Sequence, residues 1–140
     1  MGNYLVGRVR DAARRAGRKI GLLPTPVKEV PASFRVFMPG VRQPECAIGR
    51  ALMTYLCDPF VADPASSEFR RHANFFQCIA VADELAARGY VVDATHWRNP
   101  SPPSGSDYDV VFGLGPAFSA CAANRQHGAL AVYFGTGAVA

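Results

Sequence analysis

Short apolar runs alternate with helical patterns of apolar residues through most of the chain, and this alternation constrains the fold more than any other feature. The first run, Ala51–Leu56, is bounded by Gly49 and by Asp58, and is typical of a strand buried on both faces. The later patterns have the spacing of helices and further strands. The predicted elements are, in chain order, a strand over 51–56, a helix over 75–88, strands over 90–95 and 108–114, a helix over 116–125 and a strand over 129–134.

Strands that alternate with helices are joined by right-handed crossovers and lie parallel in one sheet. We therefore predict an α/β fold with a Rossmann-like parallel sheet of about four strands and flanking helices. Counted from the strand that begins at Ala51, the predicted strand order is 3-2-1-4. Ligands bind beyond the carboxyl ends of such strands. The segments where a site is expected are therefore 57–74, 96–107, 113–118 and the chain from residue 135 onward.

The N-terminal part of the chain has a different composition from the rest. Residues 1–20 carry a net charge of +5, whereas the other 120 residues carry −1. We expect a basic helical extension over 1–21, a Pro-rich linker over 22–49 with an edge strand at 34–38, and a Rossmann-like domain over 50–140.

The charge distribution also bears on partners and location. A folded part that is near neutral speaks against a nucleic-acid-binding surface. Residues 3–20 suit a solvated extension because their apolar face is mostly Ala and Val, and weak contact with an anionic membrane surface is the alternative. The sequence contains neither a run of about 20 apolar residues nor the apolar segment of a secretory signal, so we predict a cytoplasmic protein.

The four cysteines are far apart in the sequence and have no metal-ligand or disulfide spacing. They are Cys46, Cys57, Cys78 and Cys121. We expect buried free thiols, since reduced Cys packs as a small apolar residue, and we expect no bound metal.

A nicotinamide cofactor is not expected either. Its site needs a short Gly-rich turn directly after the first strand, and the loop 58–74 has 17 residues and no Gly. Asp93 stands where a ribose-binding acid would lie, but a turn residue at the end of the strand is the favoured interpretation. The same Gly-free loop argues against a small Rossmann-like methyltransferase.

Gly113 and Gly115 flank the junction between a predicted strand and a predicted helix. Backbone N–H groups and the helix dipole at such a junction can receive an anion or a sugar hydroxyl. A tight turn that returns the chain into the helix is the simpler interpretation, and we favour it.

Two polar residues precede the long predicted helix. Asn74 and Gln77 have the spacing of a capping box with Asn as the N-cap, which gives Asn74 a structural role. His72 has no such role, and both loop packing and a hydrogen bond to a substrate hydroxyl or phosphate remain open for it. His96 and His127 have no motif around them and are expected on the surface. The sequence contains no nucleophile elbow and no Walker loop, so it identifies no catalytic group.

Four stretches, taken together, resemble a known family. They are LMTYLCDPF at 52–60, RHANFFQ at 71–77, GYVVD at 89–93 and DYDVVFG at 107–113. Their order and spacing resemble the N-terminal domains of bacterial GT-B glycosyltransferases of the family 1 and family 4 type. The patterns of that group are L-L-S-Y-I-x-x-P-F, H-x-N-x-x-E, G-Y-x-V-D-V and D-Y-D-V-x-x-G, and the match covers about residues 50 to 138.

The resemblance implies transfer of a sugar from a nucleotide donor to an acceptor glycan or small-molecule acceptor, with the acceptor held mainly by this half. By position, the residues lining the acceptor side would be His72 and Asn74, and those forming its floor would be Gly113, Gly115, Thr136 and Gly137. No metal or nicotinamide cofactor is implied. Gln77 stands where the family usually has Glu, so no acid role is carried over to it.

Family members continue past the position of Ala140 into a second Rossmann-like domain that carries the nucleotide site. We therefore expect this chain to be a truncated, acceptor-side half, inactive alone, whose partner is the missing C-terminal domain. The competing hypothesis is a non-catalytic α/β binding or interaction module, because a sheet that ends on its last strand would present an apolar face to a partner.

Overall fold

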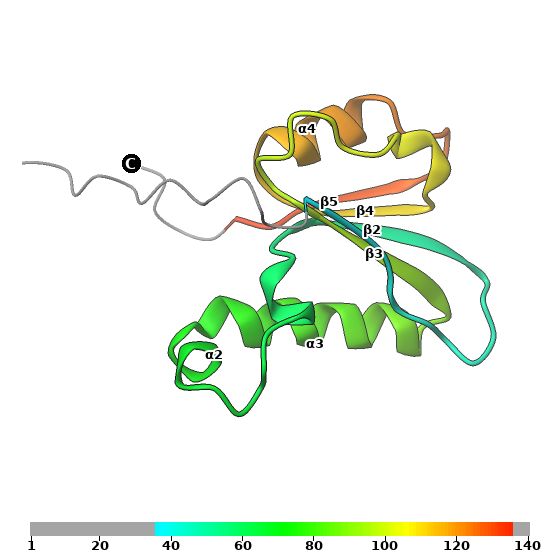
Figure 1. Ribbon diagram of the computed structural model, residues 1–140. Helices are drawn as coiled ribbons and strands as arrows, with labels where there is room; N and C mark the ends of the chain where they lie inside the picture. The colour runs from blue at the N-terminus through cyan, green and yellow to red at the C-terminus, as the bar shows by residue number, and fades with distance from the viewer. Residues whose placement is uncertain (1–35, 136–140) are drawn as a thin grey trace, which may run out of the picture. The chain divides into compact units, whose positions relative to one another are not determined.

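The computed structural model describes residues 36–135, which all belong to one of the chain's two units, residues 33–140. The predicted basic extension, the linker up to residue 35, and the two predicted site residues Thr136 and Gly137 lie outside the described residues. The described part has one sheet with helices packed against it (Figure 1).

Five strands form this sheet in the order β1-β3-β2-β4-β5. Their bounds are β1 Phe37–Arg42, β2 Gly49–Tyr55, β3 Tyr90–His96, β4 Val110–Gly113 and β5 Leu130–Tyr133. The last four run parallel, and β1 pairs antiparallel with β3 at one edge. The structure thus confirms the α/β class and the four predicted parallel strands, and it adds a fifth strand, β1, near the position expected for an edge strand.

The predicted strand order is wrong. The order 3-2-1-4 would place β4 beside β3, whereas in the structure β2 lies between them: Thr54 of β2 pairs with Thr95 on one side and with Gly113 on the other. The far edge of β3 is already taken by β1, through pairs such as Phe37 with Thr95. The chain after β3 therefore crosses back and adds β4 to the free edge of β2.

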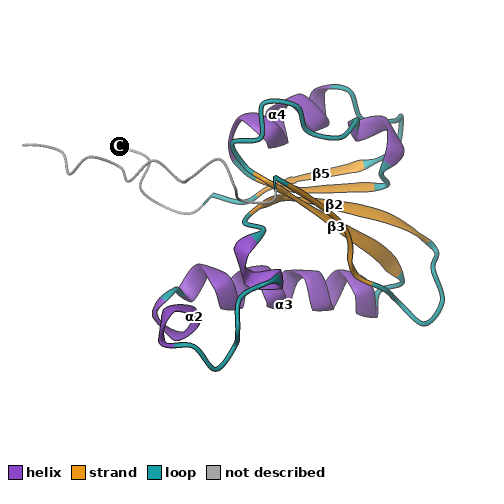
Figure 2. Ribbon diagram, viewed as in Figure 1, coloured by secondary structure: helices purple, strands orange, loops and turns teal. Residues whose placement is uncertain are grey.

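The face of the sheet that each helix covers follows from the direction in which its connection crosses the sheet. Their bounds are α2 Ser67–Arg71, α3 Ala73–Ala87 and α4 Gly115–Ala123, with single 3-10 turns at Asp58–Phe60 and Gly105–Asp107. Right-handed crossovers that run in opposite directions along the sheet, here from β2 to β3 and from β4 to β5, place their helices on opposite faces. Figure 2 shows α3 on one face and α4 on the other. No helix in this part of the chain is long and apolar enough to cross a bilayer.

The central strand β2 is buried on both faces, as its continuous apolar run predicts. On the α3 side, Met53 and Tyr55 pack with Cys78 of the helix. On the α4 side, Leu52 packs with Cys121. Both layers of core therefore meet at one strand, and the carboxyl end of that strand is held in place from both faces.

Three of the four cysteines are buried free thiols, as expected, but Cys46 is exposed. Cys46 lies in the connection between β1 and β2. Burial raises the pKa of Cys57 and of Cys78 to about 12. These two thiols are therefore protonated and unreactive at neutral pH.

Asp93 is not a residue at the end of a strand, as we expected, but a buried residue in the middle of β3 that is 1% exposed. Its carboxylate accepts hydrogen bonds from the Gly40 backbone N–H at 2.7 Å, the Tyr108 hydroxyl at 2.8 Å and the Arg50 guanidinium at 2.5 Å. Asp93 therefore joins β1, β2 and the start of β4, which is a structural role rather than a ligand-binding one.

Candidate functional site

The topology places the candidate site at the carboxyl ends of β2, β3 and β4. The chain leaves β2 toward α3 on one face and leaves β4 toward α4 on the other, so the two connections diverge. In open α/β sheets, ligands bind in the crevice at such a switch point. The residues that end these strands are Tyr55, His96 and Gly113, and Tyr55 pairs with His96 in the ladder.

A tight turn over residues 96–99 begins at this edge. It is closed by a hydrogen bond of 2.8 Å from the Asn99 N–H to the His96 carbonyl oxygen. The Arg98 N–H also donates to His96 Nδ1, at 3.2 Å. Because Nδ1 acts as the acceptor, the neutral imidazole carries its proton on Nε2. His96 therefore offers an N–H donor at the edge of the sheet.

The electrostatic surroundings of His96 favour this neutral form. Burial lowers the pKa of His96 below its ordinary value of 6.5; Asp58 acts in the opposite direction, and Arg98 lowers the pKa further. Asp58 belongs to the 3-10 turn that follows β2, so its carboxylate comes from a different segment. Together the two side chains supply a donor and an acceptor, the pair that a hydroxyl group can use.

Trp97 joins the turn to both neighbouring layers. Its backbone N–H donates to the Tyr55 carbonyl oxygen at 2.9 Å, and its backbone carbonyl oxygen accepts from the Ala117 N–H at 3.1 Å. The Arg98 guanidinium lies over the indole ring, 4.1 Å from its centroid. The exposed cation is thus held against an aromatic face whose backbone is fixed to β2 and to α4.

The two glycines at the β4–α4 junction have packing reasons of their own. Gly113 has φ +143°, and a Cβ there would collide with the carbonyl oxygen of Thr54. Gly115 has φ +75°, and a Cβ there would lie 2.7 Å from Cε3 of Trp97. The tight-turn interpretation therefore accounts for both residues.

The start of α4 offers little to an anion. Pro116 has no N–H, and the N–H of Ala117 already bonds to Trp97. Among the first three residues of α4, this leaves the N–H of Gly115. A single backbone donor is a weak phosphate site, although it can still contact a hydroxyl group.

His72 and Asn74 lie at the start of α3, and both are exposed. The helix begins at Ala73 with His72 as its N-cap residue, and no side chain caps it, so the predicted capping box of Asn74 and Gln77 is wrong. The His72 ring stacks on Phe75 at 5.0 Å, which holds this part of the chain in its sharp turn between α2 and α3. The N-cap therefore lies two residues earlier than the polar spacing indicates.

The structure does not bring the four described site candidates into one cluster. His72 and Asn74 belong to the α3 side of the sheet, whereas Gly113 and Gly115 belong to β4 and α4 (Figure 2). No hydrogen bond within residues 36–135 joins the two pairs. The 96–99 turn at the carboxyl edge is hydrogen-bonded to β2 and to α4.

Sequence reasoning missed His96, Trp97 and Arg98. The rule on carboxyl ends points to the loop 96–107, but no motif within it singles out a residue. The available signal was positional, since these three residues come directly at the end of a predicted strand and combine an imidazole, an indole and a guanidinium.

Comparisons with protein-family models, curated proteins and solved structures give no significant match to this chain. Within the described residues, no three His, Cys, Asp or Glu side chains are grouped so that they could hold a metal ion. We therefore infer the function from the geometry of the carboxyl edge.

Proposed function

We propose that this domain is the acceptor-side half of a GT-B glycosyltransferase and that it binds the acceptor at the carboxyl edge of its sheet. The observation that carries the proposal is the 96–99 turn, which holds His96, Trp97 and Arg98 at the switch point of a Rossmann-like sheet. The order of the four sequence stretches that resemble this family supports the same conclusion.

The chemistry of the edge suits a hydroxylated ligand. The Nε2–H of His96 donates to one hydroxyl oxygen, and the carboxylate of Asp58 accepts from a neighbouring hydroxyl. The imidazole and indole rings of residues 96 and 97 are nearly parallel, with centroids 5.9 Å apart and planes at 28°, and present flat apolar surface beside these polar groups. A few placed polar groups on an apolar surface are typical of small-molecule sites.

Sugar transfer requires the donor and the acceptor to be held in one geometry. The described residues form a single sheet with a single switch point. We therefore propose that transfer takes place opposite a separate donor-binding domain, and that residues 36–135 hold the acceptor without transferring sugar themselves.

A non-catalytic interaction module is the second candidate, and β5 favours it. Leu130 and Tyr133 of this edge strand are 58% and 65% exposed, although both are large and apolar. An edge strand with exposed apolar side chains and no charged residue is open to pairing with another chain.

Nuclear magnetic resonance of the ¹⁵N-labelled full chain tests the proposal. Methyl glycosides of glucose, galactose and mannose should shift the amide signals of residues 55–58, 96–98 and 113–115, and His96→Ala should remove these shifts. The matched control is His127→Ala, at the exposed opposite end of the sheet, which should change nothing. Uridine, guanosine and thymidine diphosphate sugars should show no micromolar binding by calorimetry.

Two results would contradict the proposal. Glycoside-induced shifts that map away from the carboxyl edge would place the site elsewhere, and micromolar binding of a sugar nucleotide would mean that this domain holds the donor. If no glycoside binds but the chain pairs with another protein through β5, the interaction module is the better description.

A further inference from the structure

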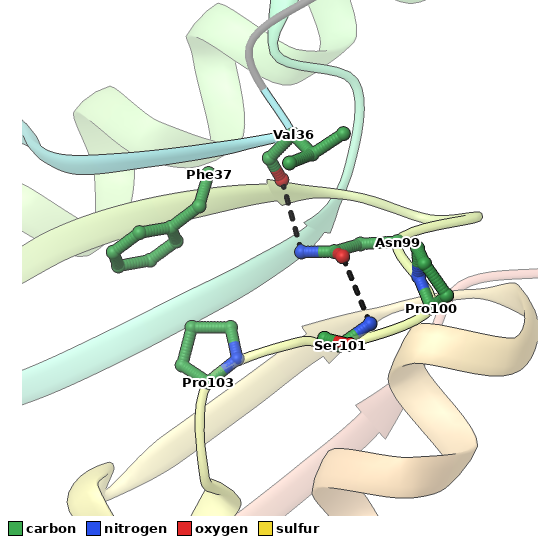
Figure 3. Close-up of a pocket in the computed structure, with 6 residues that line it drawn as sticks. All are labelled: Val36, Phe37, Asn99, Pro100, Ser101 and Pro103. Atoms are coloured by element: carbon green, nitrogen blue, oxygen red, sulfur yellow. Dashed lines mark hydrogen bonds between the residues drawn. The ribbon is translucent and has the colours of Figure 1, made fainter. Parts of the chain in front are cut away.

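An open groove of about 580 Å³ lies beside the 96–99 turn, between that turn and the edge strand β1. The residues that line it are Val36, Phe37, Asn99, Pro100, Ser101 and Pro103. Figure 3 shows these side chains around the groove, with Asn99 between the strand and the loop. The proposed acceptor site uses the first residues of the turn, and the groove begins at its last residue.

The walls of the groove are apolar, and its buried polar side chain is already satisfied. The Asn99 amide donates to Thr95 Oγ1 at 2.9 Å and to the Val36 carbonyl oxygen at 3.3 Å. Its carbonyl oxygen accepts from the Ser101 N–H at 3.0 Å (Figure 3). Because these atoms are occupied and most of the lining is apolar, the groove suits the apolar part of a ligand.

The rim of the groove leaves apolar surface open to solvent. Val36 is 48% exposed and Phe37 is 37% exposed, and the two are adjacent at the start of β1. Open apolar surface beside a concave site is typical of a ligand-binding groove.

The residue that precedes Asn99 in the chain is a cation. Arg98 directly precedes Asn99, is exposed, and has no carboxylate within ion-pair distance among residues 36–135. Its guanidinium is held over Trp97 rather than by an acidic partner. A guanidinium without an acidic partner matches a phosphate or carboxylate group, which it can bind through two parallel hydrogen bonds.

We propose that the groove and Arg98 together bind an anionic amphiphile, with its apolar tail between Phe37 and the two prolines and its phosphate or carboxylate on Arg98. In the proposed transferase this amphiphile would be the acceptor. Its role as acceptor rests on the proposed function, whereas its binding in the groove does not. The charge of Arg98 is what favours an anionic amphiphile over a neutral apolar ligand or a peptide.

Trp97 makes the binding directly observable, because it is the only tryptophan of the chain. The full chain is titrated with decyl phosphate and with decanoate below their micellar concentrations, and binding is followed by Trp97 fluorescence and by calorimetry. Decanol, which has neither charge nor sugar, tests the tail without the charge, and inorganic phosphate tests the charge without the tail. Both anionic amphiphiles should bind at least about 10-fold more tightly than either control, since the ion contact and the burial of the tail each contribute more than about 1.4 kcal/mol. A difference between decyl phosphate and decanoate tells which head group the site prefers.

Three variants locate the site. Arg98→Gln should weaken decyl phosphate binding about 10-fold in calorimetry, and Ser101→Phe, which fills the groove from an exposed position, should weaken it at least as much. Arg125→Gln is the matched control, because Arg125 is an exposed arginine that precedes β5, at the opposite end of the sheet from the groove. It should leave binding unchanged.

Equal binding of decanol, equal binding of inorganic phosphate, unchanged affinity of Ser101→Phe, or no binding at all would each overturn the inference. Failure of the proposed function gives a different result. If amphiphiles bind at the groove but no glycoside shifts the His96 signals, the groove is a binding site and the transferase assignment is wrong. If glycosides bind and amphiphiles do not, only the acceptor class proposed here is wrong.

Discussion

The guanidinium of Arg50 donates a hydrogen bond to the buried carboxylate of Asp93 across adjacent strands, at 2.5 Å. The Arg50 side chain is half exposed, whereas that of Asp93 is 1% exposed. Arg50 also lies over the Tyr108 ring, 5.2 Å from its centroid. Asp93 raises the pKa of Arg50 through its hydrogen bond and its charge, so Arg50 keeps its positive charge.

Replacing this carboxylate should destabilise the fold. We expect Asp93→Asn to lower the free energy of unfolding by about 2 to 3 kcal/mol, because three donors lose their charged acceptor and Arg50 loses its ion pair. Urea unfolding measures the change. Asp83→Asn is the matched control, since Asp83 pairs with Arg42 but is 55% exposed, and it should cost less than about 1 kcal/mol. Equal losses in both variants would contradict the central role of Asp93.

Two tyrosines should respond in opposite directions to loss of their hydroxyl groups. The Tyr55 hydroxyl is buried without a partner among the described residues, so Tyr55→Phe should leave the free energy of unfolding unchanged or raise it by about 1 kcal/mol. The Tyr108 hydroxyl bonds to Asp93, so Tyr108→Phe should lower it by about 1 to 2 kcal/mol. Thermal unfolding of the two variants decides the point. A loss in Tyr55→Phe would mean that its hydroxyl has a bonding partner in solution.

Gly113 should tolerate no side chain. Gly113→Ala forces a Cβ against the Thr54 backbone at positive φ, and we expect a loss of about 2 to 4 kcal/mol. Gly128 also has positive φ, +89°, but no atom within 4 Å of an added Cβ, so Gly128→Ala should cost only about 1 kcal/mol. Chemical unfolding of both variants separates steric contact from backbone strain. Similar losses would show that the contact with Thr54 relaxes.

The lowered pKa of His96 has a consequence for stability in weak acid. Below pH 6.5 the unfolded chain binds a proton at this residue more readily than the folded chain does, so stability falls as the pH drops through 6.5 toward the lower folded pKa. The non-titrating variant His96→Gln should therefore lose less stability between pH 7 and pH 5 than the native chain. Long-range ¹H–¹⁵N spectra should also show the Nε2–H form at pH 7. A proton on Nδ1 would contradict the bond from the Arg98 N–H.

The sequence predicts the parallel strands well because a strand buried on both faces needs an unbroken apolar run, as in residues 51–56. Strand order is a different matter, since apolar runs show which residues are buried but not which strand lies beside them. Asp93 resembles a strand end because a polar residue interrupts the apolar run there. In the structure the strand continues through it, since the distant residues Arg50 and Tyr108 supply hydrogen-bond partners for its buried carboxylate. The edge strand β1 contains Pro39 and Gly40, which give it the composition of a linker.

The candidate site is less predictable than the fold. Gly113 and Gly115 stand out in the sequence. The need for glycine at these positions comes from close contacts with Thr54 and Trp97, which the topology creates. His96 is one of three histidines and has no local motif. Its place becomes apparent only when the ladder pairs it with Tyr55 at the end of the central strand.

The central position of β2 also limits the order in which the sheet can assemble. Gly49 of β2 pairs with Tyr90 of β3. Ala51 of the same strand pairs with Val110 of β4, which lies farther along the chain. Pairings that close longer loops cost more entropy and form later. The unit β4–α4–β5 closes the shortest loop of the parallel sheet, since Val110 pairs with Leu130, and is therefore the part expected to form first. The 96–99 turn then takes up its final contact with α4 only after β4 has docked.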